Sequence, residues 1–343
     1  MGAVRIVITS PLEDHLVRAI ADTDPRLEVV YEPDLLPTPR YAADHALTSD
    51  ETPEEVERWH TLLEQADVLF DFGPASLAPQ LVSLPRLRWI QATSAGVGQF
   101  CARVGLTESP IVVTTASGVH ARPLAEFVLM AMLMFGKEAF RMAADQRAHR
   151  WERYAGQEMT GKTVGIVGVG RIGREVARVV RTLDARVVGT VRAPDGRRPE
   201  DLGLDALLPT DRVDEMLPEI DVLVLCCPHT PATHHLLTAE RLALLKPGAV
   251  LVNIARGHIV DEEAMIAALQ AGRLHGAALD VFAHEPLPAE SLLWDLPNVL
   301  ISPHSASTAD SENEKIVALF RDNLRRYLNG QPLLNVLDKE LLY

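Results

Sequence analysis

The stretch that decides the fold is Val164-Gly165-Ile166-Val167-Gly168-Val169-Gly170-Arg171-Ile172-Gly173, where an apolar run ends in a glycine-rich turn. The run predicts a strand over 164–167, and the apolar periodicity after it predicts a helix over 171–183. Strand, GxGxxG turn and helix are typical of a dinucleotide-binding βαβ unit. Its glycines allow a tight turn, the approach of a diphosphate, and close packing of helix on strand. The predicted cofactor-binding residues of this turn are Gly168, Gly170, Arg171, Ile172 and Gly173.

The end of the next strand bears on which dinucleotide binds. This strand is predicted over 186–191, and an acid at its tip would hold the ribose 2′-hydroxyl of NAD. Here Arg192 follows the strand directly, and its guanidinium suits the 2′-phosphate of NADP. The alternative is a solvated basic loop in which Asp195 reaches back to the ribose. We therefore favour NADP as the cofactor and keep NAD as the alternative.

Short apolar runs alternate with amphipathic stretches along the whole chain, which indicates βαβ units and parallel sheets. A helix is predicted over 53–65, with Thr52 as N-cap and Glu55 completing a capping box. The segment before it, 33–53, is expected to be a loop, and 121–150 a single long helix. The other predicted strands are 4–9, 27–31, 67–72, 88–92, 111–115, 222–226, 250–254, 277–281 and 299–301, and the other helices 239–245, 262–271 and 311–328.

Length and composition set limits on the function. The chain has 343 residues, a length typical of two domains, and its 47% hydrophobic and 23% charged residues are those of a globular protein. Its formal net charge of −14 argues against nucleic acid as a partner. The longest apolar run, 127–135, is too short to cross a membrane. Three cysteines are too few for a disulfide framework, so we expect a cytoplasmic protein.

Three polar residues each follow a predicted strand of the second half of the chain: Arg256, Glu285 and His304. Because ligands of open α/β sheets bind at the carboxyl ends of strands, these side chains could share one site. Histidine can donate a proton to a reduced carbonyl, a carboxylate favours the imidazolium, and arginine can hold a substrate carboxylate. Taken singly, they could equally be a surface ion pair, a turn cap and a strand-end histidine.

From about Ser94 onward the chain resembles the D-isomer-specific 2-hydroxyacid dehydrogenase family. The resemblance rests on many motifs that occur in the family's order. Beside the glycine-rich turn, these are Ser94-Ala95-Gly96-Val97-Gly98, Leu124-Ala125-Glu126-Phe127, Cys227-Pro228-His229-Thr230-Pro231, Asn253-Ile254-Ala255-Arg256-Gly257, the block from Asp280 to Leu287, and the block from Pro297 to His304.

The resemblance implies an α/β fold of two Rossmann- or flavodoxin-like, doubly wound domains with parallel sheets and the cofactor in the cleft between them. It implies a discontinuous substrate domain at 1–117 and 306–343 and a dinucleotide-binding domain at 118–305. It also implies a homodimer built through the cofactor domain, which would give the Met-rich stretch 121–150 a role. An apolar core stripe is the alternative for those methionines. Trp151 would either reach the active site of the partner or, more ordinarily, be a buried anchor.

The family also implies roles for site residues. His304 would be the acid/base, Glu285 its partner and Arg256 the substrate clamp, while the backbone amides of Gly96, Val97 and Gly98 would hold the substrate carboxylate. The cofactor side would add Cys227, Pro228, Thr233, Ala255, Arg256, Asp280 and His304. The implied activity is hydride transfer between NAD(P)H and a small 2-keto or 2-hydroxy acid, with no metal. The alternative is a dinucleotide-sensing, corepressor-like binding protein on the same scaffold.

Overall fold

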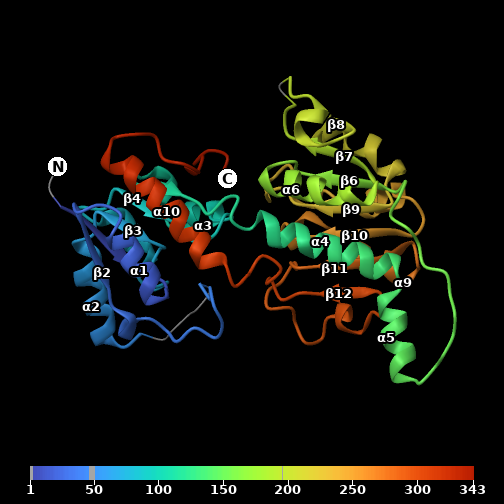
Figure 1. Ribbon diagram of the computed structural model, residues 1–343, viewed down its shortest axis with the longest axis horizontal. Coiled ribbons are helices and arrows are strands. Elements are labelled where there is room, and N and C mark those ends of the chain that lie inside the picture. Colours follow the sequence, from blue (N-terminus) through green and yellow to red (C-terminus); the bar gives the residue numbers. More distant parts are fainter. Residues whose placement is uncertain (1–2, 46–50, 195) are drawn as a thin grey trace. The chain divides into compact units, whose positions relative to one another are not determined.

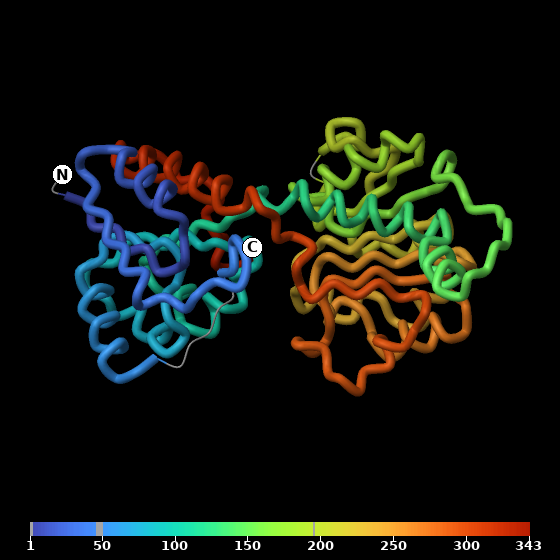
Figure 2. Tube along the Cα trace, turned by 60° about the horizontal axis from the view of Figure 1, so that its bottom comes forward, coloured from blue at the N-terminus to red at the C-terminus, as the bar shows by residue number. Residues whose placement is uncertain are grey.

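The computed structural model describes residues 3–45, 51–194 and 196–343. The chain divides into two compact units, Met1–His120 with Thr308–Tyr343 (unit 1) and Ala121–Ser307 (unit 2). Figure 2 shows the early and late parts of the sequence, blue and red, folded together in unit 1. Part of the predicted loop 33–53 and Asp195, the alternative ribose ligand, lie outside the described residues. Within the described ranges, no helix is long and apolar enough to cross a bilayer.

Unit 1 is built on a five-stranded parallel sheet of order β2-β1-β3-β4-β5 (Figure 1). Helices α1 and α10 cover one face of this sheet, and α2 and α3 cover the other. On the first face, Phe320 of α10 packs 5.2 Å from both Phe70 and Trp89, measured between ring centroids. The element bounds are β1 Val4–Ile8, α1 Asp14–Ala21, β2 Leu27–Tyr31, α2 Pro53–Glu64, β3 Val68–Phe70, β4 Trp89–Gln91, α3 Gly98–Arg103, β5 Val112–Thr114 and α10 Glu312–Leu328.

The start of α2 confirms the predicted capping box. The Thr52 hydroxyl accepts a hydrogen bond from the Glu55 N–H at 3.3 Å, and the Glu55 carboxylate accepts one from the Thr52 N–H at 2.8 Å. Pro53, which has no N–H to satisfy, occupies the first turn. Local chemistry therefore fixes where this helix begins.

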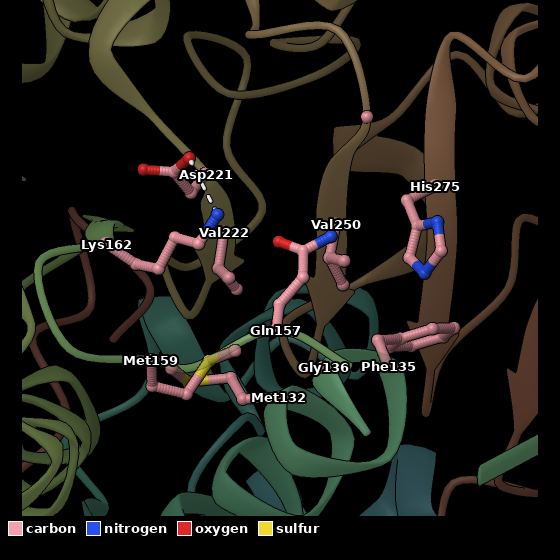
Figure 3. Close-up of a pocket in the computed structure, with 11 residues that line it drawn as sticks. Met132, Phe135, Gly136, Gln157, Met159, Lys162, Asp221, Val222, Val250 and His275 are labelled. Carbon is pink, nitrogen blue, oxygen red and sulfur yellow. Dashed lines mark ion pairs between the residues drawn. The ribbon is translucent and has the colours of Figure 1, made fainter. Parts of the chain in front are cut away.

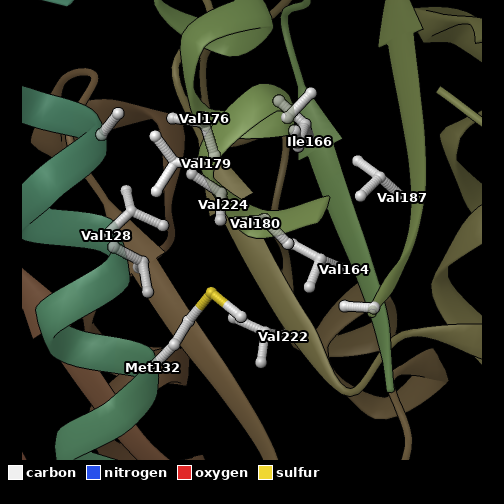
Figure 4. Close-up of a cluster of buried hydrophobic side chains, with 14 of the residues drawn as sticks. Val128, Met132, Val164, Ile166, Val176, Val179, Val180, Val187, Val222 and Val224 are labelled. Atoms are coloured by element: carbon white, nitrogen blue, oxygen red, sulfur yellow. The ribbon is translucent and has the colours of Figure 1, made fainter. Parts of the chain in front are cut away.

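Unit 2 is built on a seven-stranded parallel sheet of order β12-β11-β10-β9-β6-β7-β8. On one face, α4 and α6 bury valines of the strands, and Figure 4 shows Val128 and Met132 of α4 pointing into that layer. Helices α7, α8 and α9 cover the other face. The bounds are α4 Ala121–Gly136, α5 Ala139–Arg147, β6 Thr163–Val167, α6 Arg171–Val180, β7 Arg186–Val191, β8 Ala206–Pro209, α7 Val213–Met216, β9 Val222–Leu225, α8 Ala239–Leu244, β10 Ala249–Asn253, α9 Glu262–Gln270, β11 Leu274–Leu279 and β12 Val299–Ile301.

The prediction of one helix over 121–150 is wrong. Two helices, α4 and α5, are separated at Glu138, whose backbone is left-handed with a φ of 56°. The cause is tertiary, because the chain after α5 returns to the end of α4. There the Gln157 N–H donates to the Gly136 carbonyl at 2.7 Å, and a Cβ at Gly136 would lie 2.5 Å from the Met159 methyl carbon.

The methionines and Trp151 also separate into different environments. Met132 is 1% exposed in the core, whereas Met130 and Met142 are 43% and 46% exposed. Trp151 is 96% exposed, so its interpretation as a buried anchor is wrong. The segment that carries it, beyond α5, has neither helical nor strand structure, and its indole lies outside the core of unit 2.

Candidate active site

The sheet of unit 2 has its topological switch point between β6 and β9, because the chain continues from β6 to β7 and from β9 to β10 on opposite sides. Ligands of open α/β sheets bind at the carboxyl ends of the strands at such a point. Gly168 directly follows β6 and has a φ of 95°. A Cβ at this position would lie 2.6 Å from the Cα of Cys227, which follows β9. The structure therefore brings two predicted cofactor residues together at the switch point.

Glycine serves different purposes at positions 173 and 170 of the GxGxxG turn. A Cβ at Gly173 would lie 2.6 Å from the Gly168 carbonyl oxygen, so the close approach of α6 to the turn requires glycine. At Gly170, by contrast, no described heavy atom beyond its chain neighbours lies within 4 Å of a Cβ position. That open space precedes the ten-residue helix α6, whose first N–H groups suit a diphosphate. These residues fit a dinucleotide cofactor.

At the same edge of the sheet, His304 and Glu285 form a hydrogen-bonded pair. The His304 Nδ1 lies 2.7 Å from a Glu285 carboxylate oxygen, and the other oxygen accepts a hydrogen bond from the Phe282 N–H at 3.0 Å. Burial alone would raise the pKa of Glu285, but these hydrogen bonds and the nearby positive charges bring that pKa below its ordinary value. Glu285 is therefore a carboxylate that orients the histidine ring.

Arg256 follows β10, and its charge interacts with those of Glu285 and Asp280. Burial lowers the pKa of Arg256, while the charges of Glu285 and Asp280 act in the opposite direction. Two features shape this turn. The Asn253 side chain bonds the backbone of residues 255 and 256, and a Cβ at Gly257 would lie 1.9 Å from the Phe282 carbonyl carbon. Glycine at 257 thus lets the loop that carries Glu285 approach Arg256.

Asp280 supports the loop that carries His304. It is 2% exposed and accepts hydrogen bonds from the Ser302 hydroxyl at 2.6 Å and from the Ala306 N–H at 2.8 Å. Burial raises the pKa of Asp280, and these hydrogen bonds oppose that rise. Sequence reasoning quoted Asn253, Gly257 and Ser302 within the family motifs but assigned no role to them, although each stands at or just beyond the end of a strand.

Comparisons with known proteins agree with this geometry. Residues 129–306 match the family model described as D-isomer specific 2-hydroxyacid dehydrogenase, NAD binding domain. The chain is 33% identical over 302 residues to the glyoxylate/hydroxypyruvate reductase B of Yersinia enterocolitica, covering 86% of this chain and 90% of that protein. The chain belongs to the D-isomer specific 2-hydroxyacid dehydrogenase family.

Solved structures of the family have the same fold. A D-isomer specific 2-hydroxyacid dehydrogenase from Xanthobacter autotrophicus, in complex with NADPH and MES, has a TM-score of 0.80 at 28% identity and covers all of both chains. An NADPH-dependent glyoxylate/hydroxypyruvate reductase from Sinorhizobium meliloti, in complex with NADP and sulfate, has a TM-score of 0.78 at 26% identity over 99% of this chain and 100% of that chain.

As a D-isomer specific 2-hydroxyacid dehydrogenase, the chain is an NAD(P)-dependent oxidoreductase that transfers hydride between the nicotinamide cofactor and a 2-keto or 2-hydroxy acid. The comparisons do not favour the corepressor-like alternative, because these named relatives are reductases and dehydrogenases.

Two further predicted cofactor positions of this dehydrogenase differ in what their side chains do. Arg192 is exposed at the tip of β7, directly after the buried Val191. The Thr233 hydroxyl is buried and donates to the Pro228 carbonyl at 2.7 Å. Arg192 thus lies on the surface beyond its strand, while Thr233 holds the shape of its loop.

The predicted carboxylate-binding segment of the dehydrogenase lies in unit 1 after β4, where Gly96 and Val97 precede α3 and Gly98 is its first residue. A Cβ at Gly98 would lie 1.9 Å from the Leu342 carbonyl oxygen, so the last residues of the chain pack on this segment. Glycine at 98 is therefore required by the protein's own packing.

A small cavity of about 40 Å³ lies at the other end of the unit 2 sheet (Figure 3). Its lining includes Lys162 and Asp221, which precede β6 and β9, and these two side chains form an ion pair at 3.9 Å. Because the strands are parallel, this is the amino edge of the sheet. The dehydrogenase site lies at the carboxyl edge, and the cavity is separate from it.

Proposed function

We propose that the chain reduces 2-keto acids with NADPH and that His304 donates the proton. The observation that carries the proposal is the 2.7 Å pair of His304 and Glu285 beside Arg256, at the sheet edge that also holds the glycine-rich turn. The nicotinamide cofactor supplies the hydride when it is bound. Arg256 would hold the substrate carboxylate or polarise its carbonyl.

Proton transfer is assigned to one atom of His304. Its Nδ1 is occupied by Glu285, which leaves Nε2 to donate to the carbonyl oxygen as negative charge develops there. The His304 side chain is 45% exposed, so its ring can reach a substrate. Glu285 orients the ring and stabilises its charged form. Asp280 accepts a hydrogen bond from the Ala306 N–H and so positions the loop that carries His304.

The test of this proposal is His304→Gln. Because general acid catalysis contributes about 10²- to 10⁴-fold to a rate, we expect kcat to fall by that factor. NADPH binding, followed by nicotinamide fluorescence, should persist. The matched control is His15→Gln, at an exposed helix position of unit 1. Near-normal turnover by the His304 variant would reject the assignment.

For the substrate we propose small 2-keto acids, with glyoxylate and hydroxypyruvate first. The support is the similarity to a glyoxylate/hydroxypyruvate reductase over most of both chains. We further propose that unit 1 is the substrate domain and unit 2 the dinucleotide-binding domain, which fits the extent of the family match. A panel of 2-keto acids assayed with NADPH and with NADH tests the substrate and the cofactor together.

We propose a homodimer built through the cofactor domain. Exposed apolar side chains gather on α4, α5 and the segment after them, namely Met130, Met142, Trp151 and Tyr154. Trp151 and Tyr154 are residue types that are enriched at protein interfaces. A second copy of this chain would cover them.

We propose a cytoplasmic location. Cys101, Cys226 and Cys227 are all free thiols, as a reducing compartment would keep them.

A further inference from the structure

Four histidines cluster at the carboxyl edge of unit 2, and none of them takes part in the proposed proton transfer. His229, His234 and His235 follow β9, and His258 follows β10 (the histidine cluster). Ring centroids lie 4.2 Å apart for His234 and His235, and 5.5 Å apart for His229 and His258. The His235 N–H donates to the His258 carbonyl at 2.8 Å, so the two loops are fixed to each other.

The cluster lies beside Arg256, the proposed substrate clamp. Burial lowers the pKa of His229, and the positive charges of its neighbours lower that pKa further. Those neighbours are His258, His234, Arg256 and His235. His229 is half-buried, while His234, His235 and His258 are exposed to solvent. Positive charge on these neighbours therefore opposes the protonation of His229, and a bound anion would relieve that repulsion.

Nearby charged groups on the packed elements are engaged elsewhere. Asp261 accepts from the Ala264 N–H at the start of α9, and Glu262 accepts from the Ala283 N–H. Arg241 of α8 is paired with Asp214 at 2.6 Å. Among the described residues, no group of three or more His, Cys, Asp or Glu is arranged to hold a metal ion. The arrangement favours an anion as the ligand.

The hydrogen bond inside the cluster depends on protonation. His229 Nε2 lies 3.1 Å from His234 Nδ1, so one nitrogen must donate and the other accept. When both rings are protonated, both nitrogens carry N–H groups and the bond is lost. An oxygen anion placed between them would then accept from both rings, and such charge-assisted hydrogen bonds are strong.

We propose that the histidine cluster, beside Arg256, is a proton-dependent binding site for an oxyanion, either a carboxylate or a phosphate group. Because proton and anion binding strengthen each other reciprocally, the affinity for the anion rises as pH falls through the range in which histidine titrates. The role of this anion in turnover rests on the proposed function, but its binding does not.

The first experiment measures sulfate binding to the full-length, cofactor-free protein by calorimetry at pH 5.5 and 7.5 and constant ionic strength. Sulfate keeps its charge over this range, so only the protein changes protonation. We expect at least tenfold tighter binding at pH 5.5. His229→Gln and His258→Gln should reduce that ratio below about threefold, while His15→Gln, in unit 1, should keep it.

Equal affinities at the two pH values would overturn the proposal. So would an unchanged ratio in both cluster variants, because sulfate would then be bound elsewhere, for example by His304. Circular dichroism and the melting temperature of each variant show whether it is folded. A protein that binds sulfate in this way but reduces no 2-keto acid would refute the proposed function and leave the anion site standing.

The second experiment identifies the source of the anion. It compares 2-oxoglutarate with 2-oxovalerate, which differ by the second carboxylate, and it also measures KM for NADPH. If the anion is a second carboxylate of a substrate, beyond the one that Arg256 would hold, the kcat/KM ratio of the two acids rises at least fivefold from pH 7.5 to 6, and His229→Gln abolishes the rise. If the anion is a phosphate group of the cofactor, KM for NADPH changes with pH instead. If neither the kcat/KM ratio nor KM for NADPH changes with pH, the site has no role in turnover.

Discussion

We propose that the carboxylate of Glu285 acts on the reaction through Nδ1 of His304, from which it lies 2.7 Å away. Because hydrogen bonds and nearby positive charges hold the pKa of Glu285 below its ordinary value despite burial, the group stays charged across pH 5–9. Glu285→Gln keeps an acceptor but removes the charge that stabilises the imidazolium. We expect the pH profile of kcat/KM for reduction to move toward lower pH by about one unit, since each pH unit corresponds to about 1.4 kcal/mol.

The matched control for this change is Glu263→Gln, at an exposed position of α9. Its profile should coincide with that of the parent protein. A Glu285→Gln profile that also coincides would show that the carboxylate only shapes the loop.

We propose that Arg192, at the tip of β7, sets the choice of dinucleotide. A charge-assisted hydrogen bond to a 2′-phosphate is worth about 1.5–3 kcal/mol, so Arg192→Gln should weaken NADPH binding about 10- to 100-fold and NADH binding little. Arg186→Gln removes the same charge at the other end of the strand and should change neither. Titrations by fluorescence measure all the affinities, and equal losses for the two cofactors would remove Arg192 from this role.

Individual site residues could be predicted from the sequence where they follow the end of a predicted strand. Arg256, Glu285 and His304 each follow a strand, and the structure places His304 against Glu285 as expected. The histidine cluster was not predicted, because His229 and His258 approach each other only through the parallel pairing of β9 and β10. The histidine cluster could have been found by comparing the residues that lie the same number of positions after the ends of two neighbouring strands.

At the scale of elements, the turn between β6 and α6 contains glycines with two different roles. Gly173→Ala places a methyl group 2.6 Å from the Gly168 carbonyl, so we expect a loss of about 1–3 kcal/mol in unfolding free energy. Gly170→Ala meets no described atom beyond its chain neighbours, so the cofactor-free protein should keep its stability. Its methyl group would occupy the space proposed for the diphosphate, and NADPH binding should weaken at least tenfold.

Urea unfolding of the cofactor-free variants and NADPH titration give both readouts for this glycine pair. A Gly170→Ala protein that binds NADPH normally would show that the diphosphate lies elsewhere.

Strands were predicted better than helix ends. Buried parallel strands are continuous apolar runs, and β2, β7 and β12 have their predicted bounds. The short edge strand β8, which ends in Pro209, carries no such signal and was not predicted. The break between α4 and α5 was also missed, because contacts with residues 157–159 fix it rather than a local breaker.

For the whole molecule, a net charge of −14 opposes the entry of an anionic cofactor and an anionic acid. The carboxyl edge of the unit 2 sheet counters this charge locally. Four neighbouring strands, β10, β9, β6 and β7, are followed by Arg256 and His258, by the other histidines of the cluster, by the amino end of α6, and by Arg192, respectively. Parallel strands deliver all of these groups to the same side, so the topology concentrates positive charge where the overall composition does not.

The assembly of the whole molecule is tested at Trp151. If a second copy covers α4, α5 and the segment after them, Trp151→Ala removes the most exposed aromatic ring of that surface. Truncating such an anchor costs 2 kcal/mol or more, so the dissociation constant of the dimer should rise at least about 30-fold. Sedimentation velocity over a dilution series measures this constant. Trp294→Ala, at a tryptophan that is 51% exposed on another part of unit 2, is the control and should leave it unchanged. A dimer insensitive to Trp151 would place the interface on a different face, and a monomer at all concentrations would exclude it.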